Sequence, residues 1–455
     1  MTQDSEQNRF SGRMRRYARV GGSVGGFAAR MAGGRALGRD SDQAALASEL
    51  RGILGNLKGP VMKVAQILST IPDALPREFA AELSQLQAAA PSMGPAFVKR
   101  RMRGELGPDW QSRFGSFDSH AAAAASLGQV HRATDMNGAP LACKLQYPEM
   151  SSAVEADLKQ LDWMLAIFRR YDKSIDTRHI RAELADRLRE ELDYVREARH
   201  MRLYDYMLRD EPQVHVPAVR DDLSTDRLLT MDWLEGAPLM DFTGADVETR
   251  NTLAINLFRA WYVPFHRYGI IHGDPHLGNY AARADLSINL LDFGCVRVFP
   301  PRFAGGVIDL YRALRDGDED LAVQAYETWG FTGLSRDVID TLNIWASFLY
   351  GPLLEDATRL INSAEQPGQY GAEVAAKVHR KLKEQGGVTP PREFVLMDRA
   401  AIGLGGVFLR LGAEINWYRL FHDVVGEFSN DALAQRQQAA LTAAGLDAQE
   451  GEGDA

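Results

Sequence analysis

The sequence predicts an α+β fold of two lobes, mainly helical, with a helical extension ahead of the first lobe. Short apolar strands separated by turn residues are confined to residues 114–234. The flanking segments, 43–113 and 235–430, repeat their apolar residues at the three- and four-residue spacing of helices. A basic arm over residues 1–42 and an acidic tail over residues 431–455 complete the expected organisation.

Bulk properties restrict the function classes. The 455 residues are too many for one small core, and their 45% hydrophobic content is ordinary for a globular protein. The net charge of −9 argues against nucleic acid as a partner. No uninterrupted apolar run reaches the ~18 residues of a membrane-spanning helix. Two cysteines, Cys143 and Cys295, fit a reducing compartment.

The basic arm is the unusual segment. Residues 1–40 contain eight arginines and three acidic residues, without the apolar stretch of a secretion signal. This composition fits a transit peptide, a helix resting on anionic lipid, or a solvated arm, and all three interpretations stay open. We expect a cytoplasmic protein that contacts the inner membrane peripherally.

The expected strands begin with a hairpin. Residues 129–134 and 140–146 flank the turn dipeptide Asn137-Gly138, a strong hairpin signal. Lys144 alternates with the apolar residues of the second strand and is therefore expected on the opposite face. The other expected elements are a long helix over 181–206, strands over 215–220 and 227–233, a hinge at 235–236, and helices over 303–329, 336–355, 371–385 and 391–429.

The strongest chemical signal is the segment His272-Gly-Asp274-Pro-His276-Leu-Gly-Asn279, followed by Asp292-Phe-Gly. An Asp, an Asn five residues later and a DFG Asp are the residues with which protein kinases transfer phosphoryl groups. In that template the first Asp takes the hydroxyl proton, while the Asn and the second Asp hold Mg²⁺ against the nucleotide phosphates. Asp274 is thus the candidate base, and Asn279 and Asp292 are the candidate metal ligands.

The histidines of this segment allow another interpretation. His272 and His276 flank Asp274 as H-x-D-x-H, which is compatible with a Zn²⁺ or Mn²⁺ site. No other histidine supplies a persuasive further ligand, so we expect His272 to anchor the backbone instead.

Lys144 fits the strand lysine that holds the α/β-phosphates in kinases and pairs with a glutamate on the next long helix. Four acidic residues of the predicted helix compete for that pairing, namely Glu190, Glu191, Asp193 and Glu197. We predict Glu191 as the partner.

A glycine-rich nucleotide loop is missing from its usual place before the hairpin. Residues 121–125 are all alanine and lead into Ser126 and Gly128. Alanine favours a helix in isolation, whereas the position is that of the loop that covers the phosphates. Both interpretations stay open.

At this point the chain resembles the UbiB/ADCK family of atypical protein-kinase-like proteins, which is linked to ubiquinone and other isoprenoid lipids. The resemblance covers roughly residues 45–300. Two departures are Ala65 where the family has the Gly of K-x-G-Q, and Leu277 in place of a second Pro. The matching segments are Lys63-Val-Ala-Gln66, Ala123–Val130, Glu191-Leu-Asp193-Tyr194 with Glu197, His272–Asn279 and Asp292–Gly294.

The resemblance implies a bilobal kinase-like fold with ATP and Mg²⁺ bound between the lobes. It places Lys63 and Gln66 over the cleft where a peptide would bind, so protein phosphorylation is not expected, and it gives Asp193 a related regulatory role. The implied partners are nucleotide, an isoprenoid lipid or membrane surface, and proteins of quinone biosynthesis. Candidate nucleotide contacts are Ala123, Ala124, Ala125, Ser126, Gly128, Gln129, Lys144 and Met231.

The expected function is an ATP/Mg-binding atypical kinase or ATPase in ubiquinone-type lipid metabolism. One alternative is a nucleotide-sensing pseudokinase that acts as a lipid-binding module. Another is a small-molecule phosphotransferase of the aminoglycoside or choline type. The sequence leaves the phosphoryl acceptor, the lipid and the oligomeric state open.

Overall fold

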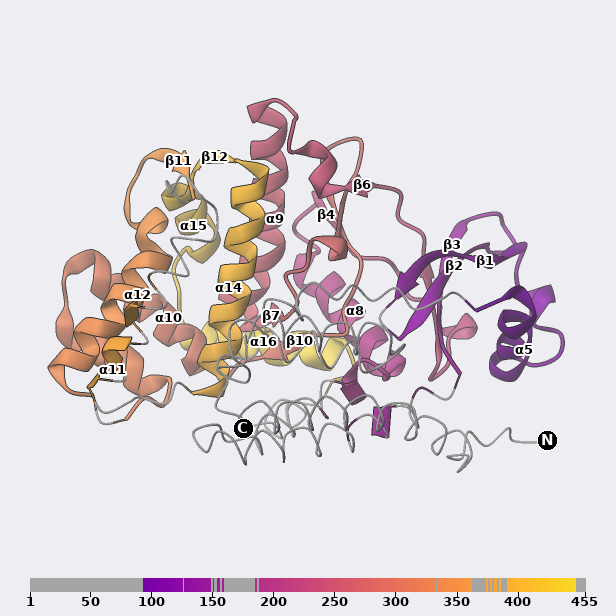
Figure 1. Ribbon diagram of the computed structural model, residues 1–455, viewed down its shortest axis with the longest axis horizontal. Helices are drawn as coiled ribbons and strands as arrows, with labels where there is room; N and C mark the ends of the chain where they lie inside the picture. Colours follow the sequence, from indigo (N-terminus) through magenta and orange to yellow (C-terminus); the bar gives the residue numbers. More distant parts are fainter. Residues whose placement is uncertain are drawn as a thin grey trace, which may run out of the picture. The chain divides into compact units, whose positions relative to one another are not determined.

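The computed structural model describes most of residues 93–446 (Figure 1). The expected extension, with Lys63 and Gln66, lies outside the described residues, as does the basic arm. The chain divides into two compact units: Met1–Glu197 with Val219–Trp233, and Ala198–Ala218 with Leu234–Ala455. The gaps inside the described range are 126, 149, 151–153, 156–157, 159–184, 186–187, 333, 362–373, 375–376, 379, 383 and 386–390.

The first unit is built on a four-stranded antiparallel sheet in the order β1-β2-β3-β5. The predicted hairpin is confirmed, because β2 pairs with β3 across a turn in which Gly138 has a φ of 86°. The apolar face of β3 packs against helix α5 and the short turn η1 in one core cluster. The elements are α5 (Pro95–Leu106), η1 (Trp110–Arg113), β1 (Ser116–Ala125), β2 (Gly128–Thr134), β3 (Pro140–Gln146), η2 (Asp221–Leu223) and β5 (Leu228–Asp232).

The alanine run forms neither a helix nor an open loop. It is the end of strand β1, in which Ala123, Ala124 and Ala125 pair with Val130, Gln129 and Gly128. Pairing with a neighbouring strand satisfies the backbone groups of the run, and that outweighs the small helix preference of alanine. The loop ahead of the hairpin is therefore reduced to the β1–β2 turn.

The predicted helix over 181–206 is interrupted. Residues 188–190 are helical, 191–193 form a turn, and α8 begins at Tyr194 and runs to Leu208. The turn forms because Asp193 accepts the N–H of Arg196 at 2.8 Å, which makes Asp193 the N-cap of a new helix. The boundary between the two units falls inside α8.

The prediction of a strand over 215–220 is confirmed only at its first residue, because residues 216–220 do not form a strand. Strand β4 covers only Val214–His215 and pairs in parallel with β9 in the second unit. Pro217 lacks an N–H and cannot continue a ladder. Past it, Val219 forms an isolated bridge with Met231 in the first unit.

The second unit is mainly helical, with a small sheet in the order β4-β9-β8-β6 and two strand pairs, β7–β10 and β11–β12. Helices α9 and α14 run side by side (Figure 1). Its other elements are β6 (Ala237–Pro238), η3 (Leu239–Phe242), α9 (Val247–Tyr268), β7 (Ile270–His272), η4 (Leu277–Asn279), β8 (Tyr280–Ala282), β9 (Ile288–Leu290), β10 (Val296–Val298), α10 (Pro301–Asp316), α11 (Glu319–Thr328), α12 (Arg336–Leu354), β11 (Thr358–Leu360), α14 (Arg392–Leu411), β12 (Glu414–Asn416), α15 (Trp417–Val425) and α16 (Asn430–Ala443).

Two of the long predicted helices are each divided at a glycine. Gly317 has a φ of 71° and separates α10 from α11, while Gly412 has a φ of 61° and ends α14. Such left-handed residues commonly close helices, and glycine adopts them without strain. Of the helix predicted over 371–385, residues 374, 377–378, 380–382 and 384 are described and helical, and the gaps of the described range take the rest except Gln385, which is in a turn.

The predicted tail is partly structured. Helix α16 occupies most of the first half of residues 431–455 and buries Leu433 completely. The side-chain amide of Gln437 donates to the carbonyls of Tyr268 at 2.7 Å and Phe299 at 2.9 Å. Among the described residues, no helix is long and apolar enough to cross a membrane.

Candidate active site

The catalytic segment runs from the end of β7 through η4 to the start of β8, in the second unit. Asn279 is nearly buried, and its side-chain N–H donates to the main-chain carbonyl of Asp274 at 3.1 Å. Its own N–H donates to the carbonyl of His276 at 2.9 Å, which closes the turn. These bonds fix the amide of Asn279 so that its nitrogen is committed and its oxygen is the end suited to a metal.

The DFG residues are joined to this segment by further hydrogen bonds. The N–H of Leu291 donates to the carbonyl of Asn279 at 3.0 Å. A carboxylate oxygen of Asp292 accepts the N–H of Gly294 at 2.9 Å. The structure therefore brings together the three segments that carry Asp274, Asn279 and Asp292.

His272 is the anchor of this arrangement. Its Nε2–H donates to the main-chain carbonyl of Asp292, and its Nδ1 accepts the N–H of Asp274 at 3.4 Å. Both ring nitrogens are thus used by the backbone, as predicted for a structural histidine. The ring also packs against the fully buried Phe293 and against Tyr204.

The same contacts argue against the Zn²⁺ or Mn²⁺ interpretation. His272 has no nitrogen left for a metal, and Nδ1 of His276 accepts the N–H of Gly278 at 3.0 Å. Within the described ranges, no group of three His, Cys, Asp or Glu side chains could share a metal ion.

Lys144 lies in the first unit and forms an almost buried ion pair with Glu197. Its Nζ donates to the two carboxylate oxygens at 2.6 and 2.9 Å. The side chains are 13% and 4% exposed. The ring of Tyr194 lies 5.3 Å from the ammonium group and shields it further.

The prediction that Glu191 pairs with Lys144 is therefore wrong, because Lys144 pairs with Glu197. Glu191 lies in the turn before α8, whereas Glu197 lies on the first turns of α8, which begins only after the Asp193 cap. In one continuous helix over 181–206, Glu191 and Glu197 would lie at other positions around the helix axis than they do in the structure. The N-cap signal of Asp193, three residues before Arg196, was the observation that could have revealed the break.

The candidate nucleotide contacts on the hairpin differ in their availability. Gly128 is needed there, because a Cβ would overlap the carbonyl of Leu145 and approach the Tyr194 hydroxyl to 2.9 Å. Gln129 is fully buried, and its side chain accepts from the N–H of Met93 at 2.7 Å and contacts His131 at 2.9 Å. Its side chain is therefore committed to the interior of the unit.

Other predicted contacts are less informative. The side chains of Ala123 and Ala124 on β1 are exposed, and Ala125 is half-buried. Met231 is 6% exposed on β5, opposite Ala142 of β3. Ser126 lies outside the described residues.

The donor set fits Mg²⁺ with a nucleotide. Asn279 and Asp292 offer an amide oxygen and carboxylate oxygens, the hard ligands that Mg²⁺ prefers. Mg²⁺ commonly takes one or two protein ligands and completes its octahedron with phosphate oxygens and water. Two protein donors are therefore sufficient when the nucleotide is present.

The sequence did not reveal the support behind the DFG segment. His200 contacts the carbonyl of Phe293 at 3.0 Å, and the ring of Tyr204 lies 5.4 Å from that of Phe293. Their spacing of four residues puts both on one face of α8. The catalytic segment has its own support from α14, where Gly403 lies against the ring of Pro275. No local signal marks either contact.

Comparisons with known proteins show the family to which this chain belongs. A family model described as an ABC1 atypical kinase-like domain matches residues 85–326. The atypical kinase COQ8, mitochondrial, of Saccharomyces cerevisiae is 29% identical over 81% of this chain and 74% of its own length. Atypical kinase COQ8B, mitochondrial, of Rattus norvegicus is 27% identical over 86% of this chain and 73% of its own length.

Similarity extends to a chloroplast protein and a solved structure. Protein ACTIVITY OF BC1 COMPLEX KINASE 7, chloroplastic, of Arabidopsis thaliana is 32% identical over 61% of this chain and 41% of its own length. The solved complex of Rv3197 with erythromycin from Mycobacterium tuberculosis has a TM-score of 0.59 and 27% identity. That match covers 83% of this chain and 95% of the other.

Proposed function

Because this chain belongs to the ABC1 atypical kinase-like family, that is, the UbiB/ADCK kinases linked to ubiquinone biosynthesis, we propose that it binds ATP with Mg²⁺ and cleaves the terminal phosphoryl group. The observation that carries the proposal is the hydrogen-bonded assembly of Asp274, Asn279 and Asp292 around His272. These bonds hold the backbone of Asp274 and Asp292 and the side chain of Asn279 in one arrangement, which supports a role in binding Mg²⁺ and nucleotide.

Each residue has a role that follows from its surroundings. Asn279 and Asp292 hold Mg²⁺, which when bound neutralises charge on the phosphates. Asp274 orients or deprotonates the attacking hydroxyl or water. Lys144 binds the α/β-phosphates, and Glu197, rather than Glu191, keeps its ammonium group in place.

The acceptor of the phosphoryl group separates the candidate activities. An ATPase delivers it to water, and a kinase delivers it to an alcohol of a lipid precursor or another small molecule. The COQ8 relatives support a place in isoprenoid-lipid metabolism. We propose ATP hydrolysis as the basal activity, with the lipid or quinone-pathway proteins as partners.

The place of action is a separate proposal. The relatives are named as mitochondrial or chloroplastic proteins. We infer that this chain acts at the surface of a membrane that makes quinones, where an isoprenoid substrate would be concentrated. ATPase activity with and without anionic liposomes tests this inference, and stimulation by the liposomes is expected.

Nucleotide binding and turnover are tested with two variants. Asp292→Asn removes a metal ligand, so the thermal stabilisation by ATP should no longer depend on Mg²⁺. Asp274→Asn keeps both ligands, so it should retain Mg²⁺-dependent stabilisation while phosphate release falls at least 100-fold, in keeping with the usual contribution of an acid–base group.

The matched control is Asp340→Asn, because Asp340 is an exposed aspartate on α12 outside the site. It should behave like the wild type in both assays. Mg²⁺-dependent stabilisation that persists in Asp292→Asn would contradict the metal assignment. Binding without phosphate release by the wild type, under all lipid conditions, would favour the nucleotide-sensing pseudokinase.

A further inference from the structure

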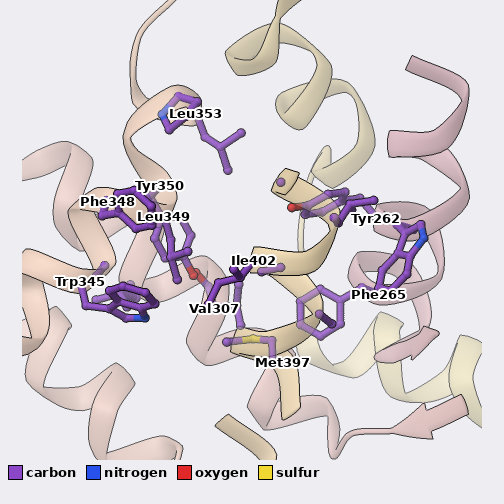
Figure 2. Close-up of a pocket in the computed structure, with 18 of the residues that line it drawn as sticks. Tyr262, Phe265, Val307, Trp345, Phe348, Leu349, Tyr350, Leu353, Met397 and Ile402 are labelled. Atoms are coloured by element: carbon purple, nitrogen blue, oxygen red, sulfur yellow. The ribbon is translucent and has the colours of Figure 1, made fainter. Parts of the chain in front are cut away.

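The second unit contains a cavity of about 500 Å³ among helices α9, α10, α12 and α14 (Figure 2). This volume lies within the range of about 300–1,000 Å³ that is typical of sites for drug-sized ligands. The cavity has its own walls in this unit and uses neither Lys144 nor the carboxylates of the catalytic segment.

The lining is apolar and rich in aromatic rings. Trp345 and Tyr350 of α12 and Met397 of α14 face Tyr262 and Phe265 of α9 across the cavity (Figure 2). Among the described residues, no Asp, Glu, Lys or Arg side chain lines the cavity. An ionised ligand would therefore lose its hydration without gaining a counter-charge.

Most polar groups of the lining are already paired inside the protein. The indole N–H of Trp345 donates to Asp398 at 2.7 Å, and that of Trp329 donates to the carbonyl of Phe303 at 3.0 Å. The hydroxyl of Tyr350 donates to the carbonyl of Val307 at 3.1 Å. The indole N–H of Trp261 donates to the hydroxyl of Tyr280, and the hydroxyl of Tyr326 donates to the side-chain oxygen of Asn343.

His266 is the exception. It lines the cavity at the end of α9 and is 2% exposed, and neither of its ring nitrogens has a hydrogen-bond partner in the part of the chain that the structure describes. Its ring is held by stacking on Tyr262 and by edge contacts with Phe265 and Phe421. Buried polar atoms are nearly always paired in native proteins, so an orphan imidazole at a cavity wall indicates a missing partner.

The charge state of this wall is set by burial. Burial lowers the pKa of His266 to about 3, so its imidazole is neutral and offers one N–H donor and one acceptor. Burial also raises the pKa of Tyr262 to about 12, so its hydroxyl stays protonated. These two residues, one helical turn apart on α9, form a small uncharged polar end in an otherwise apolar cavity.

From this geometry we propose that the cavity binds an uncharged amphiphile whose hydroxyl group hydrogen-bonds to His266 and whose apolar chain or ring system packs between α12 and α14. A hydroxyl both donates and accepts, so it can pair with either nitrogen of the imidazole. A pure hydrocarbon would fill the volume but leave the imidazole unpaired. A carboxylate would bring a charge into a lining whose described residues carry none.

The test compares three matched probes on the full-length protein: 1-decanol, methyl decyl ether and decanoate. Binding is followed by intrinsic fluorescence, because Trp261, Trp329 and Trp345 line the cavity, and by calorimetry. We expect 1-decanol to bind more tightly than the ether, because the alcohol can pair with either nitrogen of the imidazole whereas the ether can only accept from its N–H. Decanoate should bind more weakly than both.

Two variants connect this preference to the cavity. His266→Phe keeps the ring contacts and should bind 1-decanol and the ether equally. Ala401→Trp fills the cavity from α14 and should abolish binding of all three probes. Wild-type protein that binds the alcohol and the ether equally, or that binds none of the probes, overturns the proposal, as does a preference for the alcohol that survives in His266→Phe.

A further variant keeps this inference separate from the nucleotide function. Asp292→Asn, which is expected to lose Mg²⁺-nucleotide binding, should bind 1-decanol as the wild type does. Alcohol binding that disappears together with nucleotide binding would place the probe at the nucleotide site instead and would contradict the assignment to the cavity.

Discussion

Glu197 accepts two hydrogen bonds from the ammonium group of Lys144, at 2.6 and 2.9 Å, and both side chains are almost buried. With so little access to water, each of the two charges depends strongly on the other for its stabilisation. Removing one member of a buried pair leaves an uncompensated charge and costs about 3–5 kcal/mol.

This pair gives the first prediction. Glu197→Ala should lower the unfolding free energy by about 3 kcal/mol and weaken ATP binding, because Lys144 loses its orientation. Urea unfolding and ATP-dependent thermal shifts measure the two effects. Glu191→Ala is the control and should leave ATP affinity at the wild-type level. The reverse ranking of the two variants would restore Glu191 as the partner.

His272 should affect the metal without touching it. His272→Phe preserves the ring packing on Phe293 and Tyr204 but removes both bonds to the backbone. Losing such indirect support typically costs 10–100-fold in metal affinity or activity. Titration of ATPase activity with Mg²⁺ should show that shift, and unchanged Mg²⁺ dependence would argue against the anchoring role.

Gly403 is expected to be essential for packing. A Cβ at this position would overlap the ring of Pro275, which is too stiff to give way. Gly403→Ala should therefore displace α14 or the catalytic segment, at a cost of about 1–3 kcal/mol, with reduced ATPase activity. Gly405→Ala, on the same helix, meets no atom within 4 Å and should be neutral or slightly stabilising. Equal thermal unfolding of the two variants would contradict this prediction.

Asp193 is predicted to act first as a helix cap. Asp193→Ala should cost about 1 kcal/mol of stability, because the N–H of Arg196 loses its acceptor. Asp193→Asn should remain close to the wild type, since asparagine caps as well as aspartate does. If the family's regulatory role needs the charge, Asp193→Asn will change ATPase activity without changing urea unfolding.

The buried His266 predicts a pH dependence of stability. Its pKa is lowered by burial from 6.5 to about 3, so between these values the unfolded chain carries a proton that the folded chain lacks. Stability is therefore lost as the pH falls through this window, by about 2 kcal/mol between pH 7.5 and pH 5. His266→Phe should remove that part of the loss in urea unfolding. Parallel pH profiles for the two proteins would show that His266 is not the cause.

The sequence determined the parts of this protein that depend on neighbouring residues. The hairpin of β2 and β3 follows from Asn137-Gly138 and the alternation around Lys144, and both are found as predicted. The order of Asp274, Asn279 and Asp292 predicts phosphoryl-transfer chemistry, because the spacing of a short turn is itself a constraint on geometry. The backbone role of His272 could be predicted for the same reason.

Only the tertiary structure decided the relations between distant segments. The alanine run is a strand because β2 pairs with it, and Glu197 meets Lys144 because a cap at Asp193 restarts the helix. The cavity and its unpaired His266 arise where α9, α12 and α14 pack together. The periodicity of apolar residues predicts which face of a helix is buried, but it does not predict whether the side chains of neighbouring helices fill the space beside that face. Only the packing of the helices therefore creates the cavity.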